Sequence, residues 1–247
     1  VNNKNFEPFF FEDLEGETCK KKLKKDQLIT KKNFKNKVLA LIIVRSESNR
    51  LKNKALLKIK NKTCLEILIK RLTYSKLIDQ IVVCTTKNKK DDKIIRVAKA
   101  NKVDFFRGSS LNVLSRMIGA QKKYNGQLIV RVTGDDILID PEYLDKTIDL
   151  SMKSNADYVT NKGIPSGCEV EVFTKKCLED LKKYSQNPNG TEYLTNYIMD
   201  NTNEFSALKL PIPKIYKKNY RLTIDTKQDF YVVKKIIENF KDFKFSL

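Results

Sequence analysis

From residue 38 onward, short apolar runs alternate with segments that have helical periodicity. The first run is apolar throughout, as expected for a strand that is buried on both faces of a sheet. Most of the helical segments begin with a capping residue or a proline, among them a capping box at Thr63–Glu66 and a cap at Ser110. The expected strands are 38–44, 80–85, 103–106 and 127–132, and the expected helices are 63–74, 91–101, 110–124 and one that begins at Pro141.

This alternation predicts an α/β fold with a mostly parallel, doubly wound sheet that is flanked by helices. In such sheets the first strand is usually central, and the fourth strand lies beside it after the chain crosses back. Ligands bind at this switch point, beyond the carboxyl ends of the two strands. The loops after Val44 and Val132 are therefore the first places to search for chemistry.

The remaining segments are less regular. Residues 1–37 contain a Phe cluster, an acidic patch and a Lys-rich stretch without a clear period, and we interpret them as an N-terminal extension or linker. Residues 38–247 are expected to form one domain. Its second half is predicted to contain strands 168–173, 206–210 and 220–224, helices 174–184 and 190–201, and a last helix that Thr226 caps and that ends near residue 240.

Composition narrows the chemistry. The 247 residues include no His, which excludes imidazole bases, Ser-His or Cys-His pairs and His-ligated metals. The five Cys form no CxxC pair, so reduced thiols fit better than a zinc site or a disulfide framework. Because the longest apolar run, 38–44, is too short to span a bilayer, we expect a soluble, cytoplasmic protein without a membrane partner.

The net charge of +19 has two interpretations. An anionic partner, such as a nucleotide or a nucleic acid, would account for it. Alternatively, Lys residues simply cover the solvated faces, and their scattered distribution with few interleaved aromatic residues favours this second interpretation. What decides between them is whether basic residues gather at one site.

Basic residues do gather in the loop after the first strand. Residues 45–54 hold Arg45, Arg50, Lys52 and Lys54 together with two Ser hydroxyls. A triphosphate needs cations and hydroxyl or amide donors of this kind. The loop lacks the Gly spacing of a Walker motif. The alternative is a solvated basic loop without a ligand.

Carboxylates gather in the loop after the fourth strand. Gly134 permits a sharp turn, and Asp135 and Asp136 follow it at the expected switch point. Carboxylates near phosphate-binding cations indicate Mg²⁺, although a plain turn followed by a helix cap at Asp140 would give the same pattern. Asp225, at the end of a late strand, could be a second ligand, or it could help Thr226 to cap the last helix.

Several motifs resemble those of the cytidylyltransferases that activate acylneuraminate and related acidic sugars, and within this family the branch of spore-coat polysaccharide biosynthesis protein F. The family signature R-x-G-S-x-R-L-P-x-K is matched at Arg45, Ser48, Arg50, Leu51 and Lys54. The further matches, in the family's order, are 76–83, 106–109, 113–116, 131–135, 138–141, 156–159, 169–173 and 221–226. The resemblance covers residues 38 to about 240.

The resemblance implies a Rossmann-like nucleotide-diphospho-sugar transferase fold, also called glycosyltransferase-A-like, with a mixed sheet. It implies Mg²⁺-dependent transfer of CMP from CTP to a sugar, with release of pyrophosphate, for surface polysaccharide biosynthesis. By position, the nucleotide would be bound by Arg45, Ser48, Arg50, Lys54, Arg107, Arg116 and Asp135, of which Arg45, Arg50, Lys54 and Asp135 would be catalytic. Asp135 and Asp225 would hold the metal, and Asn161, Glu169 and Glu171 would face the sugar.

Two departures fall in the loop after the first strand, where Glu47 replaces the family's Gly and Lys52 replaces its Pro. Glu47 adds a negative charge beside the expected phosphates. We therefore expect its side chain to point outward or to pair with Arg50 or Lys52. The reaction itself needs no His, because a carboxylate or a metal-bound hydroxide could accept the proton of the sugar hydroxyl.

Two other functions remain open. An enzyme of the same fold could use another nucleoside triphosphate, or it could transfer a sugar from a nucleotide sugar. A basic nucleic-acid-binding protein is the more distant alternative, because the sequence contains no recognisable nucleic-acid-binding motif. We expect CTP and a sugar as partners rather than nucleic acid, and a possible homodimer through residues 160–215.

Overall fold

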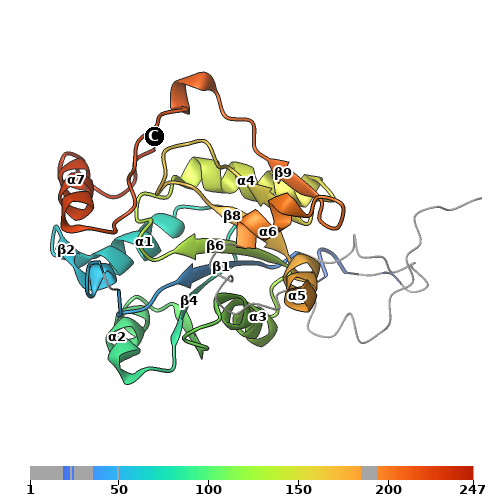
Figure 1. The fold of residues 1–247 in the computed structure, drawn as a ribbon, viewed down its shortest axis with the longest axis horizontal. Helices are drawn as coiled ribbons and strands as arrows, with labels where there is room; N and C mark the ends of the chain where they lie inside the picture. Colours follow the sequence, from blue (N-terminus) through green and yellow to red (C-terminus); the bar gives the residue numbers. More distant parts are fainter. Residues whose placement is uncertain (1–18, 23, 25–35, 49, 185–193, 247) are drawn as a thin grey trace, which may run out of the picture. The chain divides into compact units, whose positions relative to one another are not determined.

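The computed structural model describes residues 19–22, 24, 36–48, 50–184 and 194–246 (Figure 1). The chain divides into two compact units, Val1–Asn36 and Lys37–Leu247. The predicted N-terminal extension of 1–37 falls largely outside the described residues. The fold and the site below belong to the second unit.

Among the described residues, the second unit is built on a seven-stranded mixed sheet with the order β5-β4-β1-β6-β8-β7-β9. Strands β1, β4, β5 and β6 run parallel to one another, whereas β8 runs antiparallel to both of its neighbours. The strands are β1 (Val38–Ile43), β4 (Gln80–Thr86), β5 (Asp104–Gly108), β6 (Leu128–Thr133), β7 (Tyr158–Thr160), β8 (Glu171–Thr174) and β9 (Ala207–Lys209). The predicted α/β fold with a mixed sheet is confirmed.

The predicted switch point is also confirmed. β1 pairs with β4 on one side and with β6 on the other, with Ile43 opposite both Cys84 and Thr133. All six residues of β1 are buried, which explains its uninterrupted apolar sequence. The loops that follow β1 and β6 therefore leave the sheet side by side.

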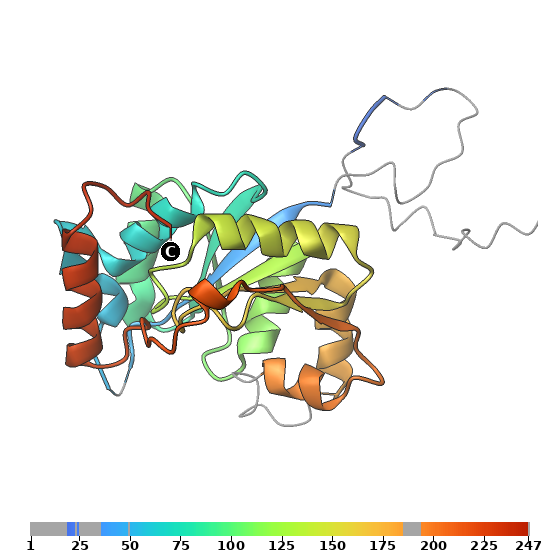
Figure 2. The same ribbon diagram turned by 90° about the horizontal axis from the view of Figure 1, so that it is seen from above.

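Helices cover both faces of the sheet. Successive side chains of β1 point to opposite faces, so alternate residues of this strand pack into two separate apolar cores. Val38, Ala40 and Ile42 pack with residues of α1 (Cys64–Leu72), α2 (Asp92–Ala100), α4 (Pro141–Lys153) and α7 (Lys227–Glu238). The intervening residues of β1 pack with α3 (Val113–Tyr124), α5 (Lys175–Tyr184) and α6 (Leu194–Asp200). Figure 1 shows α4 and α3 on opposite sides of β1 and β6, and Figure 2 shows α7 beside α1.

Several local predictions need correction. The capping box at Thr63 is confirmed, but α3 is capped by Asn112 rather than by Ser110, because Asn112 Oδ1 accepts from Ser115 N at 2.7 Å. The expected strand 168–173 is shorter and begins at Glu171. The expected strand 220–224 is wrong, since Arg221 forms only an isolated bridge with Ser166.

Some elements had not been predicted. They are the strand β7, the hairpin of β2 (Lys58–Ile59) and β3 (Lys62–Thr63), and the short 3-10 turns η3 (Lys54–Leu56), η4 (Lys89–Asp91) and η6 (Lys214–Tyr216). The start of the expected helix 190–201 lies outside the described residues. No helix in the described ranges has the length and the apolar character needed to cross a bilayer. All five Cys are free thiols, and four of them are buried.

Candidate functional site

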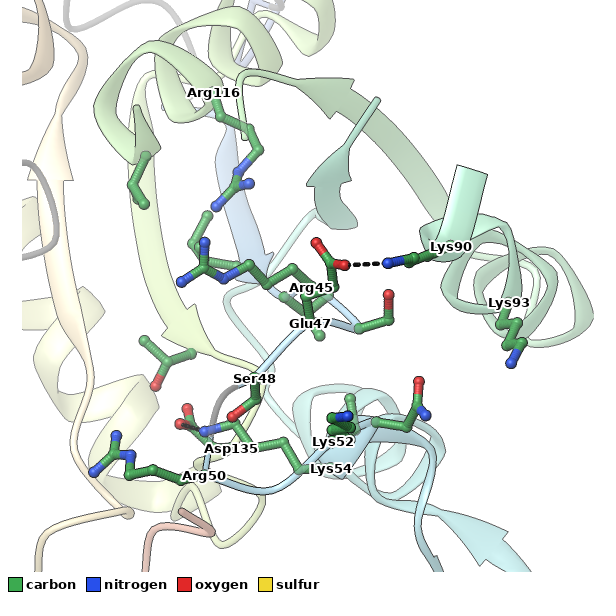
Figure 3. A pocket seen from close by; sticks show the side chains of 18 of the residues that line it. Arg45, Glu47, Ser48, Arg50, Lys52, Lys54, Lys90, Lys93, Arg116 and Asp135 are labelled. Carbon is green, nitrogen blue, oxygen red and sulfur yellow. Dashed lines mark hydrogen bonds and ion pairs between the residues drawn. The ribbon is translucent and has the colours of Figure 1, made fainter. Parts of the chain in front are cut away.

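A cavity of about 1060 Å³ opens at the carboxyl ends of β1 and β6 (Figure 3). The loop after β1 contributes most of its wall, and the end of β6, the start of α2 and α3 contribute the rest. Of the residues that the sequence predicted, six line it: Arg45, Ser48, Arg50, Lys54, Arg116 and Asp135. The basic loop thus faces a cavity, which favours the ligand-binding interpretation over a purely solvated loop.

The loop after β1 closes on itself. The carbonyl of Ser46 accepts a hydrogen bond from Asn53 N at 3.1 Å, and Asn53 has a left-handed backbone with a φ of 56°. This hydrogen bond joins the two ends of the loop, and Ser48 and Arg50, which lie between them in the chain, line the cavity. We call residues 46–53 the phosphate loop.

The loop after β6 packs tightly against the end of β1. Gly134 N donates to Ile43 O at 2.9 Å, and a Cβ atom on Gly134 would lie 2.7 Å from Val44 Cβ. Glycine is therefore required for close approach rather than for a sharp turn. The expected cap at Asp140 is present as well, since its Oδ1 accepts from Glu142 N and Tyr143 N. The helix cap at Asp140 and the carboxylates of Asp135 and Asp136 are therefore both present, and one does not exclude the other.

Lys54 joins the two carboxylates that were expected to hold metal. Its ammonium donates to Asp135 Oδ2 in a very short contact and to Asp225 Oδ1 at 3.0 Å. Burial would lower the pKa of Lys54, but the attraction of Asp135 and Asp225 outweighs burial and raises it. A single cation is therefore shared by both carboxylates.

Asp225 is held by further cations. Its side chain accepts from Arg50 at 2.8 Å and from Arg221 at 2.5 Å, and the residue is only 8% exposed. Burial would raise the pKa of Asp225, but Lys54, Arg221 and Arg50 together lower it. Because Thr226 caps α7 with Asp229, the Asp225 side chain is not needed as a cap. The structure thus favours the site interpretation of Asp225.

A second carboxyl group lies next to Asp135. Burial and the charge of Asp135 raise the pKa of Asp136 to about 7. Its side chain accepts a very short hydrogen bond from Thr133 Oγ1. Asp136 faces Thr133 rather than Lys54, so it is not part of the shared-cation arrangement.

The oxygen donors fit Mg²⁺. Asp135 and Asp225 already share one cation, and Mg²⁺ prefers few protein carboxylates combined with phosphate oxygens and water. In the ranges that the structure describes, no group of three or more acidic, Cys or His side chains could hold a metal by itself. A metal at this pair would therefore depend on ligand oxygens as well.

Glu171 reaches the cavity through Arg131. The Arg131 guanidinium makes a very short ion pair with Glu171, whose other oxygen accepts from Tyr158 Oη at 2.8 Å. Burial would lower the pKa of Arg131, but the charge of Glu171 raises it. Arg131 lines the cavity beside Arg116, which is buried and donates to Ser109 O at 3.1 Å. The sequence had not singled out Arg131.

Five predicted residues do not line the cavity: Asp225, which is linked to it through Lys54, Glu171, which is linked to it through Arg131, and Arg107, Asn161 and Glu169. Arg107 donates to Thr86 O, Asn88 O and Asp92, and so it braces the connection between β4 and α2. Asn161 and Glu169 lie in the loop between β7 and β8, at the same edge of the sheet as the end of β6.

Both of these loop residues are tied to backbone. Asn161 is fully buried and its Oδ1 accepts from Val170 N at 2.7 Å, whereas its Nδ2 has no hydrogen-bond partner in the described part of the chain. Glu169 accepts from Gly163 N at 3.0 Å, and burial raises its pKa. Both residues therefore hold the backbone of the β7–β8 loop near the carboxyl end of β6.

Glu47 is paired, as expected, but with a different partner. Its carboxylate lies 2.6 Å from Lys90 Nζ, whereas Arg50 or Lys52 had been expected (Figure 3). Lys90, in η4, and Lys93, in the first turn of α2, also line the cavity. The sequence did contain a signal for these two residues, namely the Lys-rich run 87–93. This run follows the second strand, β4, whose carboxyl end lies next to that of β1.

Comparison with known proteins supports this description. The chain is 41% identical over 205 residues to the uncharacterized protein MJ1063 of Methanocaldococcus jannaschii, covering 83% of this chain and 84% of that protein. It is 31% identical over 211 residues to the spore coat polysaccharide biosynthesis protein SpsF of Bacillus subtilis, covering 82% and 87%. A solved cytidylyltransferase from Leptospira borgpetersenii superposes with a TM-score of 0.81 at 36% identity, covering 85% and 90%.

The family model described as cytidylyltransferase matches residues 39–245, which include the whole cavity lining and Asp225. This match spans both strand-end loops and the late carboxylate that the structure brings together. The chain therefore belongs to the cytidylyltransferase family of nucleotidyltransferases.

Proposed function

We propose that the protein transfers CMP from CTP to a sugar in a Mg²⁺-dependent reaction that releases pyrophosphate. The observation that carries the proposal is the shared cation of Asp135 and Asp225, directly beside the basic phosphate loop. Cations for phosphates and carboxylates for a metal thus lie at one end of one cavity.

The cations of the cavity are suited to a triphosphate. Its lining contains eight Lys and Arg residues and two acidic residues, Glu47 and Asp135. Arg45, Arg50 and Lys54, with the Ser48 hydroxyl, would bind the phosphate oxygens. Charge grows on the pyrophosphate leaving group during attack at the α-phosphorus, so fixed cations stabilise the transition state more than the ground state.

Mg²⁺ would be held by Asp135 and Asp225, and when bound it supplies further neutralisation of phosphate charge. Without a metal, these carboxylates bind the ammonium of Lys54, as they do in this structure. When Lys54 leaves them, its ammonium is free to contact phosphate oxygens within the same cavity. Arg50, which also contacts Asp225, lies on the same side (Figure 3).

The acceptor sugar would lie beyond the end of β6, where β8 and β7 extend the sheet. Glu171, Glu169 and Asn161 lie at that edge, and Arg131 connects Glu171 to the cavity. The excess positive charge of the lining favours an acidic sugar, because its carboxylate would gain from Arg131 and Arg116 nearby. We propose that the CMP-activated sugar is used in the biosynthesis of a surface polysaccharide.

The test is binding followed by turnover. CTP with Mg²⁺ should raise the melting temperature more than GTP, UTP or ATP at equal concentration, since a ligand at about a hundredfold excess over its Kd contributes about 2.7 kcal/mol. Pyrophosphate release should then depend on an added sugar, with acidic sugars faster than their neutral counterparts. A preference for another nucleoside triphosphate, or release without any acceptor, would overturn the proposal.

A further inference from the structure

Asp91 is a buried carboxylate that connects the phosphate loop to the sheet. It is 1% exposed and lies in η4, directly after β4. Its Oδ1 atom accepts from Ser46 N at 2.8 Å and from Ser46 Oγ at 2.5 Å. Both hydrogen-bond donors of the residue that begins the phosphate loop are therefore bound to one oxygen.

The other oxygen faces the sheet. Asp91 Oδ2 accepts from Thr85 Oγ1 at 2.9 Å, from Thr86 N at 3.1 Å and from Thr86 Oγ1 at 2.5 Å. Burial would raise the pKa of Asp91, but these hydrogen bonds and those from Ser46 lower it. An ionised carboxylate only accepts hydrogen bonds, so it is matched to a site in which every neighbour donates.

The connection continues through Ser46 to the far end of the loop. The Ser46 carbonyl accepts from Asn53 N, and Asn53 precedes Lys54. Fixing Ser46 thus fixes both ends of the segment that carries Arg50 and Lys52. By contrast, the neighbouring Glu47–Lys90 pair lies in solvent, where ion pairs contribute little to stability.

We propose that Asp91 is a positioning residue for nucleotide binding: it holds the phosphate loop in its binding conformation before the ligand arrives. A loop that is already ordered loses less conformational entropy when it binds phosphates, and this gain appears as affinity. The identity of the nucleotide rests on the proposed function, whereas the anchoring of the loop does not. Asp91 does not line the cavity, whereas Ser46 does, so Asp91 acts on a ligand through Ser46.

The experiment compares Asp91→Asn with Thr85→Val. The Asn amide is neutral and places its NH₂ group against either Ser46 N or Thr86 N, which can only donate, so it should hold the loop more weakly while the size of the side chain is kept. Thr85→Val removes one hydrogen bond to the same carboxylate from the side of the sheet and leaves both bonds to Ser46. Any loss of stability common to both variants is thereby separated from a loss of loop order.

Two readouts are measured. Hydrogen exchange should show that the amides of Ser46 and Asn53 lose protection in Asp91→Asn but keep it in Thr85→Val. Calorimetry with CTP at fixed Mg²⁺ should show affinity at least about tenfold weaker in Asp91→Asn and unchanged in Thr85→Val. In turnover, Asp91→Asn should raise KM for CTP while KM for the sugar stays constant.

The outcomes are distinct. Equal CTP affinity of Asp91→Asn and wild type, or a fall in kcat alone, would overturn the positioning role, because a merely structural residue changes only the active fraction. If the wild type binds no CTP, the proposed function fails, and the exchange measurement still decides whether Asp91 anchors the loop. If Asp91→Asn does not fold, Ser46→Ala serves instead and should weaken CTP binding, and unchanged binding would overturn the proposal.

Discussion

The Lys54 ammonium donates to the Asp225 carboxylate at 3.0 Å although 171 residues separate them in the chain. The same ammonium contacts Asp135, which gives it the place that a divalent cation would need between the two carboxylates. The Lys54 ammonium and a metal ion therefore compete for the position between the two carboxylates. Nucleotide-free protein should therefore bind a metal ion weakly, and the phosphates of the nucleotide should draw Lys54 away as the metal enters.

Lys54→Met should bind Mn²⁺ more tightly than the wild type in the absence of nucleotide, by at least about tenfold, since a close charge at an effective dielectric of ~20 is worth a few kcal/mol. The same variant should bind CTP more weakly, because it loses a phosphate-binding cation. Titration calorimetry with Mn²⁺ alone, and then with CTP, measures both. Lys52→Met is the matched control, since it lines the cavity without contacting either carboxylate. Metal binding that is unchanged or weaker in Lys54→Met would contradict this competition.

Asp135→Ala and Asp225→Asn should each lower turnover by more than about a hundredfold, the scale of losing a key electrostatic group. Both should keep the fold, which circular dichroism can verify. Asp149→Asn is the control, because this carboxylate pairs with Lys153 on the surface of α4. If only one of the two variants loses activity, the model in which both carboxylates hold one metal is wrong.

Glu47→Gln should leave CTP affinity unchanged or raise it. The wild-type carboxylate is about half exposed and paired with Lys90, so its charge is already partly neutralised within the cavity lining. Removing its charge releases Lys90, which lines the cavity, to interact with phosphate. Calorimetry with CTP at fixed Mg²⁺ is the measurement, and Glu47→Gly serves to separate charge from added backbone freedom. A large loss of affinity in both variants would show that Glu47 organises the ligand.

The central half of the fold was predictable because its signals are local. A fully apolar β1 and the right-handed crossover rule place β6 beside it, and this adjacency brings the two chemically rich loops together. Asp225 was found only as one of two alternatives. Its contact with Lys54 depends on packing between distant segments, which periodicity does not report.

The failure at 220–224 has a specific cause. Gly167, with a φ of 98°, packs so closely on this segment that a Cβ atom would lie 2.4 Å from Thr223 N. The loop before β8 thus takes the position that a neighbouring strand would need. Lys90 and Lys93 were missed for another reason, because a chain rich in scattered Lys conceals the few that face a cavity.

The stability contributed by Asp91 should disappear in acid. Its pKa in the folded protein is lowered, so the unfolded chain binds the proton more readily and stability falls as pH drops below about 4. At neutral pH, Asp91→Asn should be less stable than the wild type, and the difference between them should shrink below that pH. Urea denaturation of both proteins between pH 3 and pH 7 measures this difference. A constant difference across the range would mean that ionisation of Asp91 is not linked to folding.

Arg71→Ala should destabilise the protein by about 2 kcal/mol or more, because it leaves one buried carbonyl, that of Ile139, and two partly buried ones without this donor. The Arg71 guanidinium is 1% exposed and donates to the carbonyls of Ile139, Phe243 and Phe245, at 2.7 to 3.1 Å, and it lies over the Phe245 ring. Urea denaturation measures the change. Arg96→Ala, at an exposed position of α2, should stay within about 0.5 kcal/mol. Similar losses in both variants would show that the buried guanidinium has no special role.

The late arrival of Asp225 has a consequence for the making of the protein. Strands β1, β4, β5 and β6 precede residues 221–226 in the chain and can pair before these residues are synthesised, whereas Lys54 and Asp135 gain their third partner only afterwards. Ile224 N then donates to Asp135 O, which locks the late segment beside the early one. A nascent chain that is truncated before this segment could already carry the sheet and the phosphate loop, yet it would lack the complete metal-binding pair. Synthesis of residues 221–226 would thus be the step at which the proposed metal-binding pair becomes complete.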